Sequence, residues 1–378
     1  MRPRGEHFRQ NRLIGVVLAV CSMTIGARAQ SGRKPNPPPS APNPIARIET
    51  REVMLPLNAY DAEGNNVTDL APKDLLVVEN GEPRAITRLR REPASVVIVL
   101  DLSNEIGTFK NGASQRYNAN DEQPQINHDG PVWARKYEIV PRPAAREFAD
   151  NFVAGLAEDD EIAIIQYSDR VQLVQDWTRD RKQALDSLHS KYRAGLKARY
   201  YDALTLATEK LRDRFGRKVI VLLSDGLDSA SRARRQQAVV AVERSGAAVF
   251  VVAWEDVLRS EITGAINWLA HEGSGSREAK RTAELRHHLT LLEGASFELN
   301  DLAEKSGGEF VTPEDFDQLV ATAPKSLNRE IGAQYSLAFV TERGPSLEDE
   351  RTVEVLASRP GLTVRARRVY YLGDPPRP

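Results

Sequence analysis

The strongest constraint on the fold is a set of short, continuously apolar segments that alternate with longer amphipathic ones. Three of them read VVIVL at 96–100, VIVLL at 219–223 and AVFVVA at 248–253. A strand is apolar at every position when both of its faces are covered, which is typical of a parallel sheet between helix layers. We therefore predict an α/β fold with a doubly wound, mostly parallel sheet flanked by helices.

Further strands and helices are expected at regular intervals along this part of the chain. The expected strands span 96–100, 161–167, 171–175, 218–223 and 247–253, and the expected helices span 144–156, 181–189, 201–212 and 231–245. Thr178 before the second helix and Gly246 after the fourth are residue types that commonly begin and end helices.

Two segments interrupt this alternation, at 104–141 and 255–294, and both exceed ordinary loop lengths. In the second, apolar residues recur at helical spacing from Leu258 to Leu269, which predicts helix there. The segment GSGSRE at 273–278 is expected to be a flexible loop. His287 and His288 are adjacent and do not share a helix face, so we expect a solvated helix surface rather than a metal pair.

The flanks of this α/β domain, expected at 93–332, are typical of β structure. Residues 45–92 contain alternating strand-like runs around Asn80-Gly81, a strong hairpin signal. Alternation returns at 333–373. We expect these N- and C-terminal strands to pack together as a small β-sandwich-like module.

The N-terminus carries the pattern of a secretory signal peptide at 1–29, with a basic start, a short apolar run and Ala-Arg-Ala before Gln30. A proline-rich linker is expected at 30–44. These features predict a secreted, periplasmic or cell-surface protein, cleaved after Ala29, with no transmembrane helix in the mature chain. The formal net charge of −1 provides no overall field that would attract nucleic acid.

Polar residues follow the apolar strands where each strand ends. In an open parallel sheet, ligands bind in the crevice beyond the carboxyl ends of the strands. The candidate residues at these ends and in the loop before the third helix are Asp101, Ser103, Glu105, Ala198, Arg199, Tyr200, Ser224, Asp225 and Asp228.

Three segments that contain these residues resemble the metal-site segments of a von Willebrand factor type A domain. They are VVIVLDLSNE at 96–105, KARYYDAL at 197–204 and VIVLLSDG at 219–226. Together with the flanking β segments, the order of elements from about 45 to 373 is similar to the bacterial VWFA-related Acidobacterial domain family. The resemblance implies a protein-interaction or adhesion function through a metal-ion-dependent adhesion site.

That site is expected to depart from the family pattern, which has D-x-S-x-S, a distal Thr and a distal Asp. Asp101, Ser103 and Asp225 match, whereas Glu105 replaces a Ser and Ala198 stands at the Thr position. The resemblance thus implies metal ligands Asp101, Ser103, Glu105 and Asp225 for Mg²⁺, Mn²⁺ or Ca²⁺, and a partner-binding loop with Ala198, Arg199, Tyr200 and Asp228. Oxygen ligands suit these hard cations.

Three interpretations of the acids remain open from the residues alone. They hold a cation, or Arg199 or a nearby Lys neutralises them, or they only cap loop and helix amides. For function, the first expectation is interaction with an unidentified protein partner, without catalysis. A metal-independent envelope scaffold is the alternative, and a Mg²⁺-dependent phosphohydrolase-like enzyme is a remote one.

Overall fold

The computed structural model describes residues 50–103, 141–195, 197–272, 275–342 and 350–372. The expected signal peptide, its cleavage site, the linker, nearly all of the first insertion and Glu105 lie outside the described residues. Within the described residues, no helix combines the length and apolar character needed to cross a membrane.

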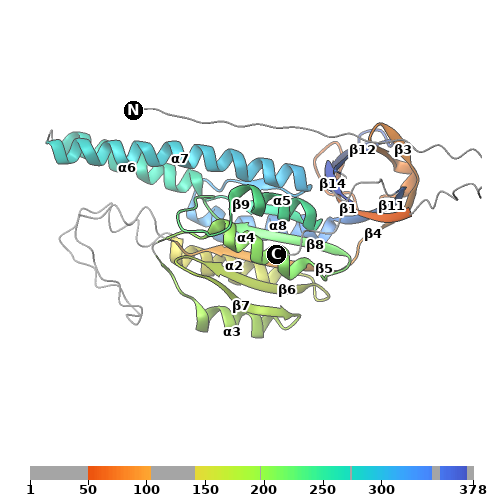
Figure 1. Ribbon diagram of the computed structural model, residues 1–378, viewed down its shortest axis with the longest axis horizontal. Helices are drawn as coiled ribbons and strands as arrows, with labels where there is room; N and C mark the ends of the chain where they lie inside the picture. Colours follow the sequence, from red (N-terminus) through yellow and green to blue (C-terminus); the bar gives the residue numbers. More distant parts are fainter. Residues whose placement is uncertain (1–49, 104–140, 196, 273–274, 343–349, 373–378) are drawn as a thin grey trace, which may run out of the picture. The chain divides into compact units, whose positions relative to one another are not determined.

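The centre of the fold is a six-stranded sheet with the strand order β10-β9-β8-β5-β6-β7 (Figure 1). Its strands are β5 (Ala94–Asp101), β6 (Glu161–Tyr167), β7 (Val171–Thr178), β8 (Arg217–Leu223), β9 (Ala248–Val252) and β10 (Phe310–Val311). Neighbouring strands are parallel except β7, which runs antiparallel to β6 at one edge. The predicted mostly parallel sheet is thereby confirmed.

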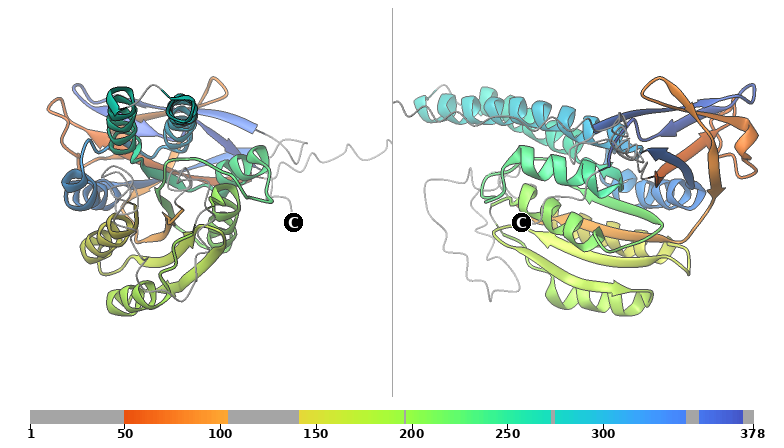
Figure 2. Two further views of the ribbon diagram at one scale, coloured as in Figure 1. Left: turned by 90° about the vertical axis from the view of Figure 1, so that its left-hand side faces the viewer. Right: turned by 45° about the vertical axis from the view of Figure 1, so that its right-hand side comes forward.

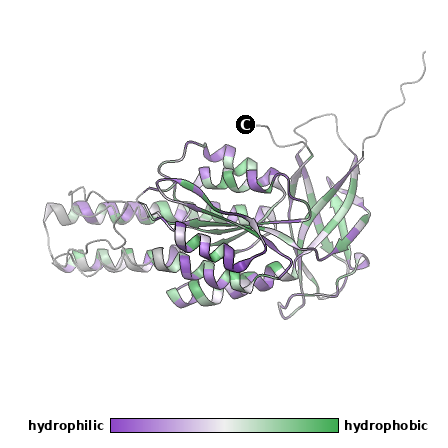
Figure 3. Ribbon diagram, turned by 90° about the horizontal axis from the view of Figure 1, so that it is seen from below, coloured by the Kyte–Doolittle hydropathy of each residue, from purple (hydrophilic) through white to green (hydrophobic). Residues whose placement is uncertain are grey.

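Helices cover both faces of this sheet, which explains why its central strands β5, β8 and β9 are apolar at nearly every position (Figures 2 and 3). Along β5, Val96, Ile98 and Leu100 belong to one core cluster, while Val97 and Val99 belong to another. The first face packs against α2 (Pro141–Gly155), α3 (Arg181–Lys191) and α8 (Ala323–Ala333), and the second against α4 (Tyr200–Leu211) and α5 (Arg235–Ser245).

The second insertion forms two long helices, α6 (Glu255–Glu272) and α7 (Ser276–Ser306), which lie side by side (Figures 1 and 2). The predicted helical spacing is confirmed, because Leu258, Ile262 and Leu269 are buried. The expected loop at 273–278 is shorter than predicted, since α7 already begins at Ser276.

The prediction of a solvated surface for the histidine pair is wrong for one residue. His287 is exposed, but His288 is only 4% exposed because it shares a buried face of α7 with Leu285 and Leu292. Residues three and four apart share a helix face, so adjacent histidines can have opposite environments.

Two antiparallel sheets form the β module. Sheet A has the order β13-β1-β11-β4, and sheet B has the order β14-β12-β2-β3. The strands are β1 (Thr50–Tyr60), β2 (Leu75–Glu79), β3 (Glu82–Arg84), β4 (Ile86–Arg90), β11 (Tyr335–Glu342), β12 (Glu350–Ala357), β13 (Thr363–Ala366) and β14 (Val369–Tyr371). One apolar cluster draws on strands of both sheets, including Leu57, Val77 and Phe339. This confirms a sandwich-like module built from N- and C-terminal strands.

Local sequence signals were partly right about the ends of these elements. Asn80 and Gly81 both have positive φ, 48° and 84°, as a tight hairpin between β2 and β3 requires. Gly246 ends α5 in the left-handed conformation. Thr178, however, ends β7, and Asp180 caps α3 instead by accepting a hydrogen bond from the Gln183 amide at 3.0 Å.

The helix expected at 231–245 begins later, at Arg235. The Asp202 carboxylate accepts hydrogen bonds from the amides of Arg232 (3.0 Å) and Ala233 (2.8 Å). These bonds satisfy donors that a helix would otherwise use or expose, so the segment before Arg235 is held as a loop.

A buried arginine connects the β module to the α/β domain. Arg217, the first residue of β8, donates to the carbonyls of Glu92, Ile331 and Gln334, the last at 3.2 Å. Its guanidinium also lies 3.6 Å from the Asp160 carboxylate. Because guanidinium groups satisfy several acceptors at once, this one side chain joins the segment before β5, the end of α8 and the Asp160 carboxylate.

Candidate functional site

Asp101 occupies the centre of the carboxyl edge of the sheet, as the last residue of β5. It is 1% exposed. Its Oδ1 accepts hydrogen bonds from the Ser103 amide (2.9 Å) and the Ser103 hydroxyl (2.6 Å). The predicted pair Asp101 and Ser103 is therefore brought together, and the hydroxyl orients the carboxylate.

The other oxygen of Asp101 faces two hydroxyl groups from neighbouring strands. Oδ2 accepts from the Tyr167 hydroxyl at 2.8 Å and from the Ser224 hydroxyl at 3.3 Å. The two hydroxyls share a hydrogen bond of 2.6 Å. Tyr167 ends β6 directly opposite Asp101 in the parallel register, a relation that strand alignment would have revealed. Sequence reasoning missed Tyr167.

Asp225 follows β8 beside this cluster and is 9% exposed. Its Oδ1 accepts a hydrogen bond from the Leu227 amide at 2.9 Å. Gly226 has φ of +77°, and a Cβ there would lie 3.0 Å from Leu299 of α7. Helix α7 therefore packs directly on the Asp225 loop, and only glycine fits that contact without strain.

Burial dominates the electrostatics of these groups. Loss of solvation raises the pKa of the Asp101 carboxyl, although hydrogen bonds from Ser103, Tyr167 and Ser224 oppose the rise. The pKa of Tyr167 is raised well above its ordinary value by burial and then by the charges of Asp101 and Asp225. Tyr167 thus stays a protonated donor, and both acids act on the same hydroxyl. We call Asp101, Ser103, Ser224 and Asp225 the strand-end site.

Arg199 points to a partner other than the site acids. Its guanidinium forms an ion pair with Asp202 at 3.1 Å and donates to the Asp169 carbonyl at 2.8 Å. Burial alone would raise the pKa of Asp202, but the amides of Ala233 and Arg232 and the charge of Arg199 lower it. Asp202 is therefore a stable anion that holds the arginine. This geometry removes the main support for Arg199 as the counter-ion of Asp101.

The remaining residues of the predicted partner loop shape it from within. Ala198 and Tyr200 are buried, and the Tyr200 ring lies 6.3 Å from the Tyr167 ring. Asp228 accepts a hydrogen bond from the Ser231 hydroxyl and one from the Tyr201 amide at 3.4 Å. Their side chains position the loops around the site.

Hydrogen bonds join the loop before α4 to the loop after β8. The Ala198 carbonyl accepts from the amides of Ser229 (3.1 Å) and Ala230 (2.9 Å), and the Ala198 amide donates to the Ser229 hydroxyl at 3.1 Å. The Asp202 amide donates to the Ser231 hydroxyl at 3.1 Å. The two loops form one ordered surface at the carboxyl edge.

The donor atoms of the strand-end site are all oxygens, the ligand type that Mg²⁺ and Ca²⁺ prefer. Two buried carboxylates and two hydroxyls supply them, and Ala198 contributes no side-chain oxygen. Among the described residues there is no group of three or more His, Cys, Asp or Glu side chains able to hold a metal ion. A cation here would depend on hydroxyls and water as well as on carboxylates, and in chemical type the residues fit such a cation.

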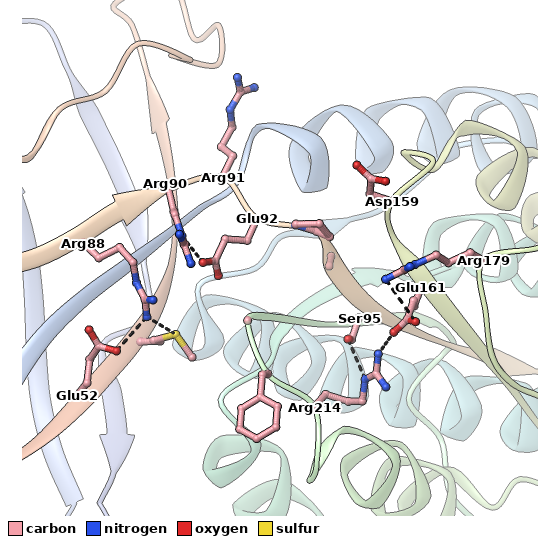
Figure 4. Close-up of a pocket in the computed structure, with 15 residues that line it drawn as sticks. Glu52, Arg88, Arg90, Arg91, Glu92, Ser95, Asp159, Glu161, Arg179 and Arg214 are labelled. Atoms are coloured by element: carbon pink, nitrogen blue, oxygen red, sulfur yellow. Dashed lines mark hydrogen bonds and ion pairs between the residues drawn. The ribbon is translucent and has the colours of Figure 1, made fainter.

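A separate cavity of about 710 Å³ lies near the opposite edge of the sheet, against sheet A (Figure 4). Its charged lining is Glu52, Arg88, Arg90, Arg91, Glu92, Asp159, Glu161, Arg179 and Arg214. Most of these charges pair with one another, as Arg88 does with Glu52 at 2.9 Å and as Arg179 and Arg214 both do with Glu161. The cavity therefore offers balanced ion pairs rather than converging free ligands.

Comparison with known proteins finds a family match within the α/β domain. Residues 136–227 match the family model described as von Willebrand factor type A domain. No curated protein matches the chain. The narrower resemblance to the Acidobacterial family stays a prediction.

The solved structures that match this chain are distant in sequence. A von Willebrand factor type A protein from Catenulispora acidiphila is 11% identical, covers 86% of this chain and 74% of its own, and gives a TM-score of 0.41. An aerotolerance-related membrane protein from Bacteroides fragilis is 18% identical, with coverage of 64% and 98% and a TM-score of 0.35. The vWF domain of the pilus tip protein Mfa5 from Porphyromonas gingivalis is 16% identical, with coverage of 49% and 53% and a TM-score of 0.25.

Proposed function

We propose that this chain, which carries a von Willebrand factor type A domain, is a secreted or cell-envelope module that binds a protein partner at the carboxyl edge of its sheet. The observation that carries the proposal is the strand-end site, where two buried carboxylates and two hydroxyls converge beneath two loops joined by hydrogen bonds. Loops on a rigid sheet edge are the usual place for binding residues.

A divalent cation is part of this proposal. Asp101, Ser103 and Asp225 would hold it, with Glu105 as the fourth expected ligand. The cation would supply a positive charge able to bind an acidic group of the partner. The Arg199–Asp202 ion pair supports this version, because it directs the arginine charge away from Asp101.

Titration with Mg²⁺ and Mn²⁺ tests the cation version directly. Isothermal titration should show binding that Asp101→Asn abolishes. Ala198→Thr should increase the affinity for metal by supplying the hydroxyl that the family pattern places there. Ala198→Val should leave the affinity unchanged, because valine has nearly the shape of threonine but no hydroxyl oxygen. If neither metal binds to the wild-type chain or to Ala198→Thr, and EDTA leaves thermal stability unchanged, the cation version is wrong.

The interaction itself needs a separate test. The purified chain is immobilised and used to capture proteins from an envelope extract, alongside Asp225→Asn and the matched surface variant Asp186→Asn on α3. A partner retained by the wild type and the α3 variant, but lost by Asp225→Asn, supports binding at the strand-end site. Equal capture by all three would favour the scaffold alternative.

Location is also a proposal. The N-terminal pattern of the sequence motivates export, and N-terminal sequencing of the exported chain should begin at Gln30. A chain that retains residues 1–29 in the cytoplasm would refute it.

A further inference from the structure

The loops around the strand-end site carry a group of exposed cationic side chains. These are Arg170, Arg193, Lys197, Arg232 and Arg234, all exposed, and we call them the basic rim. They follow β6, precede α4 and precede α5, so three chain segments contribute to one edge. In the described part of the chain, none of the five takes part in an ion pair.

The segments that carry the rim are fixed to one another. The Gly195 amide donates to the Leu102 carbonyl at 3.1 Å, and the Lys197 amide donates to an Asp169 carboxylate oxygen at 2.9 Å. The Arg232 amide is held by Asp202 at 3.0 Å. The backbone beneath the rim is therefore ordered before any partner arrives, which lowers the entropic cost of binding.

The acids of the same edge are already occupied. Asp202 forms an ion pair with Arg199 and accepts hydrogen bonds from two amides, and Asp228 accepts one from the Ser231 hydroxyl. Glu298 of α7 forms an ion pair with Arg235 at 2.8 Å. Asp101 and Asp225 are buried. With Asp202 and Glu298 balanced by their arginine partners, the five rim cations outnumber Asp169 and Asp228, the remaining described acids of this edge that keep some exposure to solvent. The charge that these residues present to solvent is therefore positive, although the whole chain has a formal net charge of −1.

We propose that the basic rim recognises an acidic segment of a protein partner, one that carries several Asp or Glu residues, and that this recognition does not require a bound cation. The inference rests on the proposed interaction function and names the chemistry of its partner. Arginine favours such contacts because its planar guanidinium binds carboxylates through two parallel hydrogen bonds.

A protein partner fits the rim better than a nucleic acid does. Single-stranded nucleic acids are bound where basic residues stand beside aromatic rings on which bases stack. Of the aromatic residues next to the rim, Tyr200 is buried, with its ring near those of Tyr201 and Tyr167, and Tyr192, which precedes Arg193, is partly buried against the core. Four of the five rim residues are arginines, the basic residue enriched at protein interfaces.

The test uses fluorescence anisotropy with the full chain and a labelled peptide rich in Glu, Asp and Leu. A second peptide with Gln and Asn in place of the acids is the ligand control. The acidic peptide should bind with EDTA present, and binding should weaken as salt screens the charges beyond roughly 8 Å. The double variant Arg232→Glu/Arg234→Glu should lose at least about tenfold in affinity.

A matched variant, Arg329→Glu/Arg368→Glu, makes the same change in net charge at exposed positions of α8 and the β module. It should bind the acidic peptide as the wild type does, and circular dichroism melts should confirm that both variants fold. Equal binding of the two peptides, an equal loss in both variants, or tighter binding of heparin or duplex DNA through the same arginines would overturn the proposal. If a captured partner is lost by Asp225→Asn but retained by the rim variant, the interaction function stands and the rim proposal falls.

Discussion

His288 should make the stability of this protein fall in mildly acidic solution. The side chain is 4% exposed in α7, and burial, followed by the charge of His287, lowers its pKa from 6.5 to about 4. The unfolded chain therefore binds a proton between these values while the folded chain does not. Stability from neutral His288 is fully present above the unfolded pKa and is lost as the pH falls toward the folded pKa.

The size of this effect follows from the shift. Each pKa unit corresponds to about 1.4 kcal/mol, so the complete loss is about 3 kcal/mol. Between about pH 7 and about pH 5, roughly 2 kcal/mol of the free energy of unfolding should disappear because of this one residue. That is a large part of the 5–15 kcal/mol, roughly, that stabilises a typical domain.

This loss of stability is measured by urea unfolding of the wild type, His288→Leu and His287→Leu at both pH values. His288→Leu should show a smaller decrease in unfolding free energy between the two pH values, by about 2 kcal/mol, because leucine cannot take up a proton. His287 is exposed and adjacent, so His287→Leu should retain most of the wild-type decrease. If His288→Leu and the wild type lose stability in parallel, burial of a neutral His288 does not explain the pH dependence.

Three further predictions concern the strand-end site and the contact that Arg217 makes between the β module and the α/β domain. Gly226→Ala should lower the free energy of unfolding by about 2 kcal/mol, because φ is +77° and the new Cβ would lie 3.0 Å from Leu299. Gly246→Ala should lower it less, because Gly246 has a similar φ of +75° but open space around it. Thermal melts compare the two variants, and equal losses would refute the contact with α7. Arg217→Met should lower the free energy of unfolding by about 3 kcal/mol, because Asp160 and three carbonyls lose their donor. The same substitution at the exposed Arg368 should change the free energy of unfolding little. Urea unfolding measures both variants, and similar values for the two would contradict the role of Arg217. Asp202→Asn should weaken Mg²⁺ binding, because Arg199 loses its ion pair and can turn toward the site acids. The double variant Asp202→Asn/Arg199→Gln should restore the affinity for Mg²⁺. If isothermal titration finds the double variant as weak in Mg²⁺ binding as Asp202→Asn, this reasoning is refuted.

The central sheet was predictable because several of its strands are continuously apolar segments that stand out in the sequence. Continuous apolar runs such as 96–100 have few structural solutions, and the alternation with amphipathic segments fixed the fold class. Boundaries were less predictable, because they depend on tertiary hydrogen bonds. The start of α5 shows this, since Asp202, distant in sequence, holds the amides before Arg235.

The same limit applies to the strand-end site. Strand ends indicated Asp101, Ser103 and Asp225, because carboxyl ends of parallel strands meet at one edge. The direction of Arg199 could not be read from the sequence, since it depends on the side chain of Asp202 and the carbonyl of Asp169. Tyr167 was missed because an aromatic residue at a strand end also reads as core.

The interleaved sandwich has a mechanical consequence. In sheet A, β1 from the N-terminal part pairs antiparallel with β11 from Thr50 to Leu57, and β13 borders β1 on the other side. Tension applied between Thr50 and Leu372 would enter through β1 of sheet A and leave through β14 of sheet B, which pairs with β12. The α/β domain is inserted between β4 and β11 in the chain, and α5 also holds the chain just before β14, because Arg367 donates to the carbonyls of Glu243 and Ala247. A pulling force would therefore be shared between the two sheets of the sandwich and α5 of the α/β domain.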